Sequence, residues 1–218
     1  MTPDAEARRE QMITQQVRSW SVLDEQVLQA MTVVPREVFM PAEYRDLAFA
    51  DTSLPLGEHQ QIPPPKVEGR MLQALALQSS DEVLVIGVGN GYLAACAAKL
   101  AKRVICVEPQ PDIAEQARKN LLAAAINNAT VETGDGTQLK NGNHYDAILI
   151  TASLPVYDER FERALNQGGR LVMISGISPV MQVMRVIRVG ANQWQREVLF
   201  ETDIPPLQGA TNPPAFVF

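Results

Sequence analysis

The sequence predicts an α/β fold, with a doubly wound, mostly parallel seven-stranded sheet, an N-terminal helical extension and an antiparallel C-terminal edge. An apolar strand at 83–86 runs into a glycine-rich turn and an alanine-rich helix, which is typical of a nucleotide-binding unit. Further short apolar strands alternate with helical segments, which predicts parallel strands with helices on both faces. The strands expected at 180–188 and 194–200 lack a helix between them, so they are expected to form an antiparallel hairpin.

Residues 1–78 are predicted to form a helical and loop region that packs on a main domain at 79–218. Apolar residues recur at helical spacing between 5 and 20, and Asp24 can cap a second helix. A short helical or turn segment is expected at 37–44. The stretch 54–65 is predicted to be a loop, because it ends in three consecutive prolines. A helix is expected at 67–77.

The main domain is predicted to contain four strands and two helices between the alanine-rich helix after the glycine turn and its C-terminal hairpin. Gly134 to Gly136 closes one strand as a turn, and Gly168-Gly169 is expected to stop the second helix. In chain order the expected elements are a strand at 103–107, a helix at 110–124, a strand at 129–132, a strand at 145–150, a helix at 156–165 and a strand at 171–174.

The spacing of the three glycines distinguishes between two classes of cofactor, dinucleotides and adenosyl sulfonium compounds. Gly87, Gly89 and Gly91 form G-x-G-x-G, whereas a dinucleotide fingerprint is G-x-G-x-x-G and wants glycine where Tyr92 stands. Glu108 ends the second strand about 20 residues after the first glycine, where an acid meets a ribose diol. The pattern favours S-adenosylmethionine (AdoMet); a dinucleotide site and a merely structural turn remain alternatives.

The expected cofactor site lies where parallel strands end at one edge of the sheet. Asp135 could accept a hydrogen bond from an adenine amino group or only stabilise its turn, and Glu108 could bind ribose or be a solvated charge. Asp146 precedes an apolar strand and is expected to be structural. The candidate cofactor residues are Ile86, Gly87, Val88, Gly89, Asn90, Gly91, Tyr92, Glu108, Pro109, Asp135, Gly136, Thr151 and Ala152.

Composition argues against several other classes of function. The 218 residues carry a net charge of −6, with no basic run, so nucleic acid is not an expected partner. No apolar run is long enough for a membrane span, and the acidic N-terminus is unlike a secretion signal, so a cytoplasmic protein is expected. Cys96 and Cys106 are expected to be buried thiols. His59 and His144 lie far apart, so no metal site is expected.

Several stretches together resemble the protein-L-isoaspartate O-methyltransferase family. They are Val34 to Phe39 with Pro41, residues 47–51 and 54–57, the glycine turn through Tyr92, Gly134 to Gly136, and residues 146–152. The resemblance implies a Rossmann-like class I AdoMet-dependent methyltransferase fold. It also implies methyl transfer from AdoMet, with S-adenosylhomocysteine as product, to the carboxylate of isoaspartyl and D-aspartyl residues in damaged proteins. The ester then collapses to a succinimide, which can reopen to normal aspartate.

The chain departs from the family in the loop that the resemblance places at the acceptor. Where the family usually has G-Q-T-I-S, this chain has His59, Gln60, Gln61, Ile62 and Pro63. Pro63 stands at the position of a serine implicated in the family's active site, and proline has neither hydroxyl nor N–H. Val85 and Asn90 likewise replace a common glutamate and serine.

The expected chemistry does not depend on that serine as a nucleophile. A carboxylate acceptor is already ionised at neutral pH and needs no general base, so alignment and removal of water dominate. Gln60, Gln61 or His59 could supply the lost hydrogen bond. Two alternatives stay open: a methyltransferase of the same fold acting on another acceptor, and a non-catalytic AdoMet-binding protein. A monomer or weak homodimer is expected, and the proline-rich tail from 204 should pack over the domain or at a subunit contact.

Overall fold

The computed structural model describes residues 3–57, 59–139, 142 and 144–213. A seven-stranded sheet has the order β5-β4-β3-β6-β7-β8-β9, and β3 to β7 run parallel while β8 and β9 are antiparallel. This confirms the predicted fold, including its antiparallel edge. The strands are β3 (Glu82–Ile86), β4 (Arg103–Glu108), β5 (Ala129–Thr133), β6 (Tyr145–Leu154), β7 (Leu165–Ile177), β8 (Val180–Gly190) and β9 (Gln193–Thr202).

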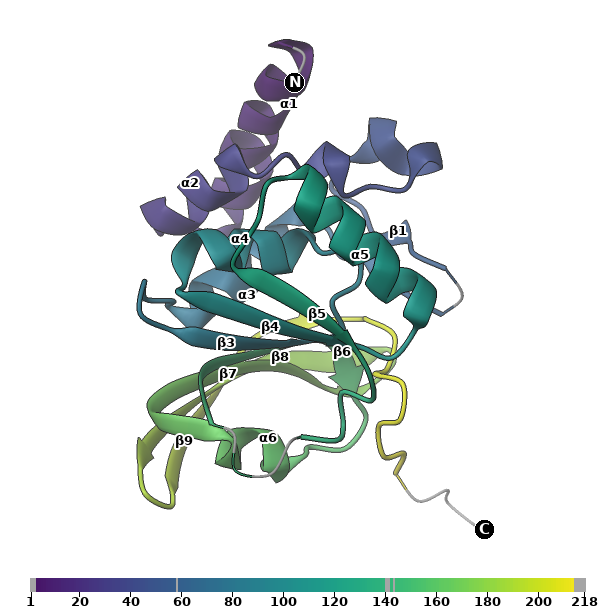
Figure 1. The fold of residues 1–218 in the computed structure, drawn as a ribbon. Coiled ribbons are helices and arrows are strands. Elements are labelled where there is room, and N and C mark those ends of the chain that lie inside the picture. Colours follow the sequence, from purple (N-terminus) through teal and green to yellow (C-terminus); the bar gives the residue numbers. More distant parts are fainter. Residues whose placement is uncertain (1–2, 58, 140–141, 143, 214–218) are drawn as a thin grey trace.

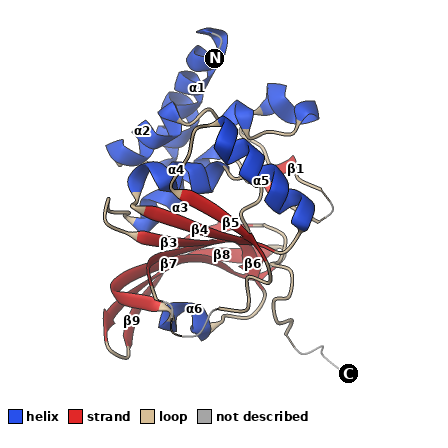
Figure 2. Cartoon of the chain, in the orientation of Figure 1, coloured by secondary structure: helices blue, strands red, loops and turns tan. Residues whose placement is uncertain are grey.

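The helices cover the two faces of the sheet unequally (Figures 1 and 2). On one face lie α3 (Pro65–Leu75), α4 (Tyr92–Leu100) and α5 (Pro111–Ala123), and the N-terminal helices pack above them. The other face carries α6 (Glu159–Arg163). Apolar residues fill a core on each side, and both cysteines are buried and free.

The N-terminal region begins with α1 (Pro3–Met12), which continues as a π turn η1 (Ile13–Val17) and a 3₁₀ turn η2 (Arg18–Trp20). Next comes α2 (Glu25–Val33), where Asp24 accepts from the backbone N–H groups of Gln26 and Val27 as the sequence predicted. Two 3₁₀ turns follow, η3 (Arg36–Val38) and η4 (Ala42–Leu47). They lead the chain towards the edge of the sheet where the strands end.

Two sequence predictions about loops need correction. The stretch 54–65 contains a two-stranded antiparallel hairpin, β1 (Leu54–Pro55) and β2 (Gln61–Ile62). Pro65 opens α3 instead of excluding a helix, because proline at the first helical position gives up an N–H that has no intrahelical partner.

The predicted helix at 156–165 is also wrong in extent. The helix α6 has five residues, and the chain is already in the sheet at Leu165, which pairs with Tyr145. Gly168 and Gly169 therefore lie inside β7 and do not stop a helix. Gly168 has φ +78°, a left-handed conformation that glycine adopts without strain, and it lies where the register between β6 and β7 shifts.

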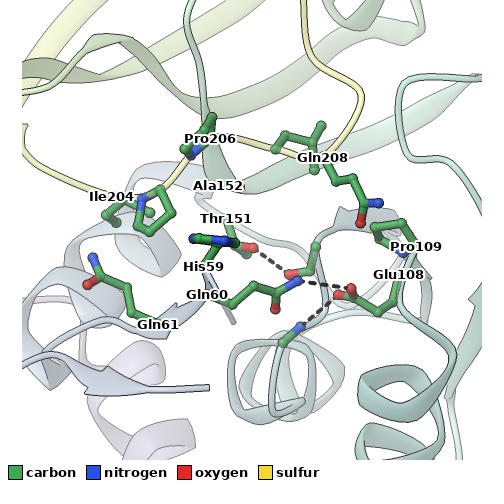
Figure 3. Close-up of a pocket in the computed structure, with 14 residues that line it drawn as sticks. His59, Gln60, Gln61, Glu108, Pro109, Thr151, Ala152, Ile204, Pro206 and Gln208 are labelled. Carbon is green, nitrogen blue, oxygen red and sulfur yellow. Dashed lines mark hydrogen bonds between the residues drawn. The ribbon is translucent and has the colours of Figure 1, made fainter. Parts of the chain in front are cut away.

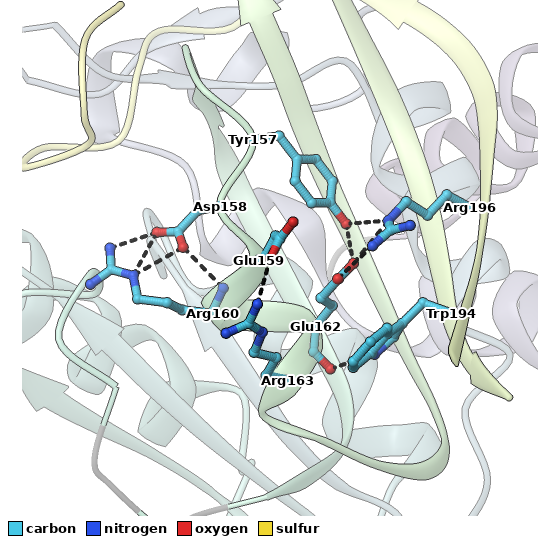
Figure 4. Close-up of polar contacts among 8 residues, drawn as sticks. All are labelled: Tyr157, Asp158, Glu159, Arg160, Glu162, Arg163, Trp194 and Arg196. Atoms are coloured by element: carbon cyan, nitrogen blue, oxygen red, sulfur yellow. Dashed lines mark hydrogen bonds and ion pairs between the residues drawn. The ribbon is translucent and has the colours of Figure 1, made fainter. Parts of the chain in front are cut away.

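A hydrogen-bonded network holds α6 against the sheet (Figure 4). The Glu162 carboxylate, 1% exposed, accepts from Arg196 Nη2 at 2.5 Å and Nε at 3.0 Å and from the Tyr157 hydroxyl. The Trp194 indole N–H donates to the Glu162 carbonyl at 3.0 Å. This network joins α6 to the edge strand β9, which provides Trp194 and Arg196.

The chain after β9 returns to the end of β6. Ser153 N–H donates to the Pro205 carbonyl at 3.0 Å, and Leu207 N–H donates back to the Ser153 carbonyl at 2.8 Å. Leu207 is buried in the core beneath. The described part of the tail therefore packs over the domain; residues 214–218 lie outside the described part. Among the described residues, no helix has the length and apolar character to cross a bilayer.

Candidate active site

The carboxyl ends of β3, β4 and β6 meet at one cleft (Figure 3). They bring Gly87, Glu108 and Thr151 together from positions far apart in the sequence, since parallel strands end at the same edge. The cleft holds about 450 Å³ including its open mouth, within the roughly 300–1,000 Å³ typical of small-molecule sites. Its lining residues are His59, Gln60, Gln61, Gly87, Gly89, Glu108, Pro109, Thr151, Ala152 and residues 204–208.

The glycine turn has a backbone that other residues adopt only with strain. Gly87, Gly89 and Gly91 have φ of +78°, +55° and +90°. A Cβ at Gly87 would lie 2.7 Å from Thr151 Oγ1, so a side chain there would collide with the end of β6. The Thr151 hydroxyl donates to the carbonyls of Ile86, at 3.2 Å, and Gly87. These contacts keep the turn open towards the cleft.

Glu108 is a buried carboxylate whose hydrogen-bond partners among the described residues are all neutral. It accepts from Gly89 N–H, Gln110 N–H and Gln60 Nε2, each at 3.3 Å. Burial raises the pKa of its carboxyl, and these hydrogen bonds oppose the rise. An acceptor held by long neutral bonds fits the hydroxyls of a ribose, so the residues present fit a nucleoside cofactor at this edge.

Asp135 and Gly136 lie beside a different cavity, together with Ile86. Asp135 is exposed and accepts from the Thr137 N–H at 2.8 Å and the Thr137 hydroxyl at 2.7 Å; these bonds lower the pKa of its carboxyl. The turn-stabilising role is therefore present. Gly136 has no room for a side chain, because a Cβ would lie 2.4 Å from Ile86 Cγ2.

The remaining candidates of the glycine turn, Val88, Asn90, Gly91 and Tyr92, do not line this cleft. Val88 and Tyr92 are buried in the core. Asn90 Oδ1 accepts from Tyr92 N–H at 3.1 Å, and the Asn90 carbonyl accepts from Asn120 at 2.9 Å, so this residue ties the turn to α4 and α5.

Asp146 accepts from Glu82 N–H and Asn166, which is the structural role expected from the sequence.

The loop at 59–63 brings two glutamines to the lining of the cleft, each held by a different partner. Gln60 donates to Glu108, and Gln61 Nε2 donates to the Asp203 carbonyl at 3.0 Å. His59 also lines the cleft, in a left-handed conformation with φ +59°. Pro63 is buried outside the lining, and its carbonyl accepts from Arg36 Nη2 at 2.9 Å.

Sequence reasoning did not place the wall formed by residues 204–208 in the site. The proline-rich tail from 204 was expected only to pack over the domain or at a subunit contact. Its partner Ser153 lies some fifty residues earlier, and no local pattern reveals that pairing. No group of three or more His, Cys, Asp or Glu side chains that could hold a metal occurs in the described part of the chain.

A sequence model described as Protein-L-isoaspartate(D-aspartate) O-methyltransferase matches residues 7–203. The chain belongs to this family. It is 40% identical over 181 residues to the protein-L-isoaspartate O-methyltransferase of Methanoculleus marisnigri, covering 83% of this chain and 82% of the relative. Protein-L-isoaspartate O-methyltransferase 2 of Pelobacter propionicus is 41% identical over 208 residues, 94% of this chain and 92% of that one.

A solved structure shows the same fold for a family protein. It is the crystal structure of a putative protein-L-isoaspartate O-methyltransferase from Plasmodium falciparum in complex with S-adenosyl-L-homocysteine. The TM-score is 0.78 at 18% identity, covering 94% of this chain and 98% of that chain. The shared fold therefore spans nearly the whole chain.

Proposed function

We propose that this chain is an AdoMet-dependent methyltransferase that methylates the carboxylate of isoaspartyl and D-aspartyl residues in damaged proteins. Family membership over residues 7–203 is the observation that carries the proposal. The cleft supports it, because a left-handed glycine turn and a carboxylate with neutral partners lie at the same edge of the sheet. The net charge of −6 supports a protein acceptor over nucleic acid.

The cofactor would lie along the ends of three strands. Glu108 would accept hydrogen bonds from the ribose hydroxyls, and Gly87 and Gly89 would let the backbone approach the ligand. Thr151 and Ala152 would line the side of the cleft that faces residues 204–208. Pro109 would lie beside the adenine, and Asp135 would accept from its amino group through Oδ2, because both hydrogen bonds from Thr137 go to Oδ1.

AdoMet supplies an electrophilic methyl group on a sulfonium that carries its own leaving group. The protein's task is then to align the acceptor carboxylate with that methyl and to exclude water. His59, Gln60 and Gln61 each bring a side-chain hydrogen-bond donor to the lining of the cleft. Pro63 has no donor, and its carbonyl accepts a hydrogen bond from Arg36. We therefore assign orientation of the acceptor to His59 and the two glutamines.

The test is transfer of a labelled methyl group to an isoaspartyl peptide, with the matching aspartyl peptide as control. We expect labelling of the isoaspartyl peptide alone, and faster transfer by the Pro63→Ser variant if the lost hydroxyl limits the rate. Pro63 is the observation that favours a different acceptor. Tight binding of S-adenosylhomocysteine without transfer to the peptide would contradict the proposal, and labelling of another acceptor would then identify the redirected enzyme.

A further inference from the structure

Arg36 is fully buried between the N-terminal region and the glycine turn. Its exposed fraction is 0%, and its three guanidinium nitrogens donate to three separate segments. Nε donates to Glu68 Oε2 of α3 at 2.9 Å, Nη1 to the Ala48 carbonyl, and Nη2 to the Pro63 carbonyl at 2.9 Å. A planar fork of donors can hold several acceptors in fixed relative positions, which a lysine cannot do.

The same guanidinium also touches the end of the cofactor turn. Its central carbon lies 5.4 Å from the centroid of the Tyr92 ring, and Tyr92 is the residue directly after Gly91. The ring is fixed from another side by an edge contact with Phe39 at 5.8 Å between centroids. We call residues 59–63 the acceptor-side loop. Arg36 therefore contacts both Pro63, which ends this loop, and Tyr92, which follows the glycine turn.

The contact with Pro63 has a particular consequence in this chain. Proline has no N–H, so the carbonyl is the one backbone group through which residue 63 can be held. Pro63 follows Gln60 by three residues and Gln61 by two, so its position sets where their side chains enter the cleft. A hydrogen bond to a charged donor is the strong kind, and here it is shielded from water.

We propose that Arg36 is a positioning residue that holds the acceptor-side loop, residues 59–63, at a fixed place against the glycine turn. The expected effect on KM rests on the proposed function. The expected effect on the position of the loop does not depend on it. Loss of the guanidinium fork should loosen the loop and misplace the donors of Gln60 and Gln61. The backbone of the glycine turn, set by the glycines themselves, should stay competent for cofactor.

Glu68 gives the proposal a dependence on pH. Burial raises the pKa of its carboxyl to about 7, against the attraction of Arg36. The other titratable groups facing it are the Tyr92 hydroxyl and the Cys96 thiol, and burial raises the pKa of both, so neither ionises near neutral pH. Below about pH 7, Glu68 becomes neutral and leaves the guanidinium without its anionic partner. The hold on the loop should weaken as the pH falls through that value.

The experiment compares Arg36→Lys and Glu68→Gln with Glu37→Gln. Glu37 is the matched control, because it pairs with the buried Arg9 at 2.5 Å in the same region but makes no described contact with the loop or Tyr92. We expect Arg36→Lys to raise the KM for the isoaspartyl peptide at least about tenfold, because one charge-assisted hydrogen bond to the loop is lost. The affinity for S-adenosylhomocysteine should change much less. We expect the KM of the parent protein to rise as the pH falls from about 8 to 6, and Glu68→Gln should abolish that rise.

Amide hydrogen exchange separates this proposal from the function itself, since it needs no acceptor. Exchange at residues 60–62 should be faster in Arg36→Lys than in the Glu37→Gln control. In the parent protein, exchange at these residues should become faster as the pH is lowered, after correction for intrinsic rates. If Arg36→Lys does not fold, Glu68→Gln carries the test. Unchanged exchange and an unchanged pH profile, or equal effects in the control, would overturn the proposal. Faster exchange in a protein that methylates no peptide would retain it and refute only the proposed function.

Discussion

Glu68 in α3 and Glu162 in α6 are both buried carboxylates paired with an arginine, but they lie on opposite faces of the sheet. Glu162 is held by two nitrogens of Arg196 and by the Tyr157 hydroxyl, and the Arg196 side chain keeps 40% of its exposure to solvent (Figure 4). Glu68 accepts from one nitrogen of Arg36, whose side chain is 0% exposed.

This difference separates a structural ion pair from one that positions other groups. In the pair at α6 the arginine stays partly hydrated, and its hydrogen bonds go to Glu162 and Tyr157. This pair therefore holds only α6 against β9. At α3 the whole pair is desolvated, and two nitrogens of the arginine serve backbone carbonyls. A desolvated pair gives little net stability relative to an apolar replacement, yet removal of one partner is costly.

The largest effect should come from removing each arginine. We expect Arg36→Met to lower the free energy of unfolding by about 3–5 kcal/mol, because it leaves a buried carboxylate and two buried carbonyls without their donor. Arg196→Met should cost about 1–2 kcal/mol, since its side chain is part-exposed and Tyr157 still donates to Glu162. Urea denaturation above pH 7.5 measures both, and the opposite ranking would refute the distinction.

Glu108 extends the comparison to a buried carboxylate with no described cation. We expect Glu108→Ala to weaken S-adenosylhomocysteine binding by about 10–100-fold, the loss of hydrogen bonds to a charged acceptor. Its stability should change little, because the charge is buried against neutral donors only. Calorimetric titration tests this, with Glu162→Gln as the control that should bind normally. Equal affinities in both variants would show that Glu108 does not hold the cofactor.

The stability of the protein should carry a pH-dependent component from Glu68. The pKa of Glu68 is about 7 in the folded chain against an ordinary value of 4.5, so the folded state binds the extra proton between these values. Stability should therefore fall as the pH rises from about 4.5 to 7, by up to about 1.4 kcal/mol per pH unit from this group. Glu68→Gln should remove that component and Glu162→Gln should leave it. Denaturation curves across this range decide the matter.

The smallest expected effect is that of Tyr157→Phe. The hydroxyl donates to Glu162, and the pKa of Tyr157 is raised to about 12, chiefly by burial and then by its contact with that carboxylate. Because Arg196 still binds Glu162 through two nitrogens, we expect a loss of only about 1 kcal/mol in the free energy of unfolding. A loss as large as that of Arg36→Met would mean that the α6 network behaves as one unit.

The fold was largely predictable because its signals are local. A few consecutive residues are enough to recognise each of the main signals: the buried strands of β-branched residues, the glycine turn and the acid at 108. The boundary of α6 was missed because Asn166 to Gly169 resembles a helix stop, whereas Leu165 already pairs with Tyr145 in the sheet. The hairpin of β1 and β2 is too short to have a periodicity.

The site was predictable only where strand ends define it. Gly87, Glu108 and Thr151 meet because parallel strands bring their ends together, and the sequence supplies that rule. The wall at 204–208 and the pair of Arg36 with Glu68 depend on contacts between distant segments. Charged residues are normally solvated, so the sequence alone does not indicate that Arg36 and Glu68 are buried.

The two cysteines give the folded molecule an unusual chemical inertness. Both thiols are buried, and burial raises the pKa of Cys106 to about 12 and that of Cys96 further still. Alkylating and oxidising reagents attack the thiolate, so the intact fold withholds its sulfur from them. Labelling by iodoacetamide would then occur only in molecules that have opened, and its rate would count those openings under conditions in which the protein is otherwise native.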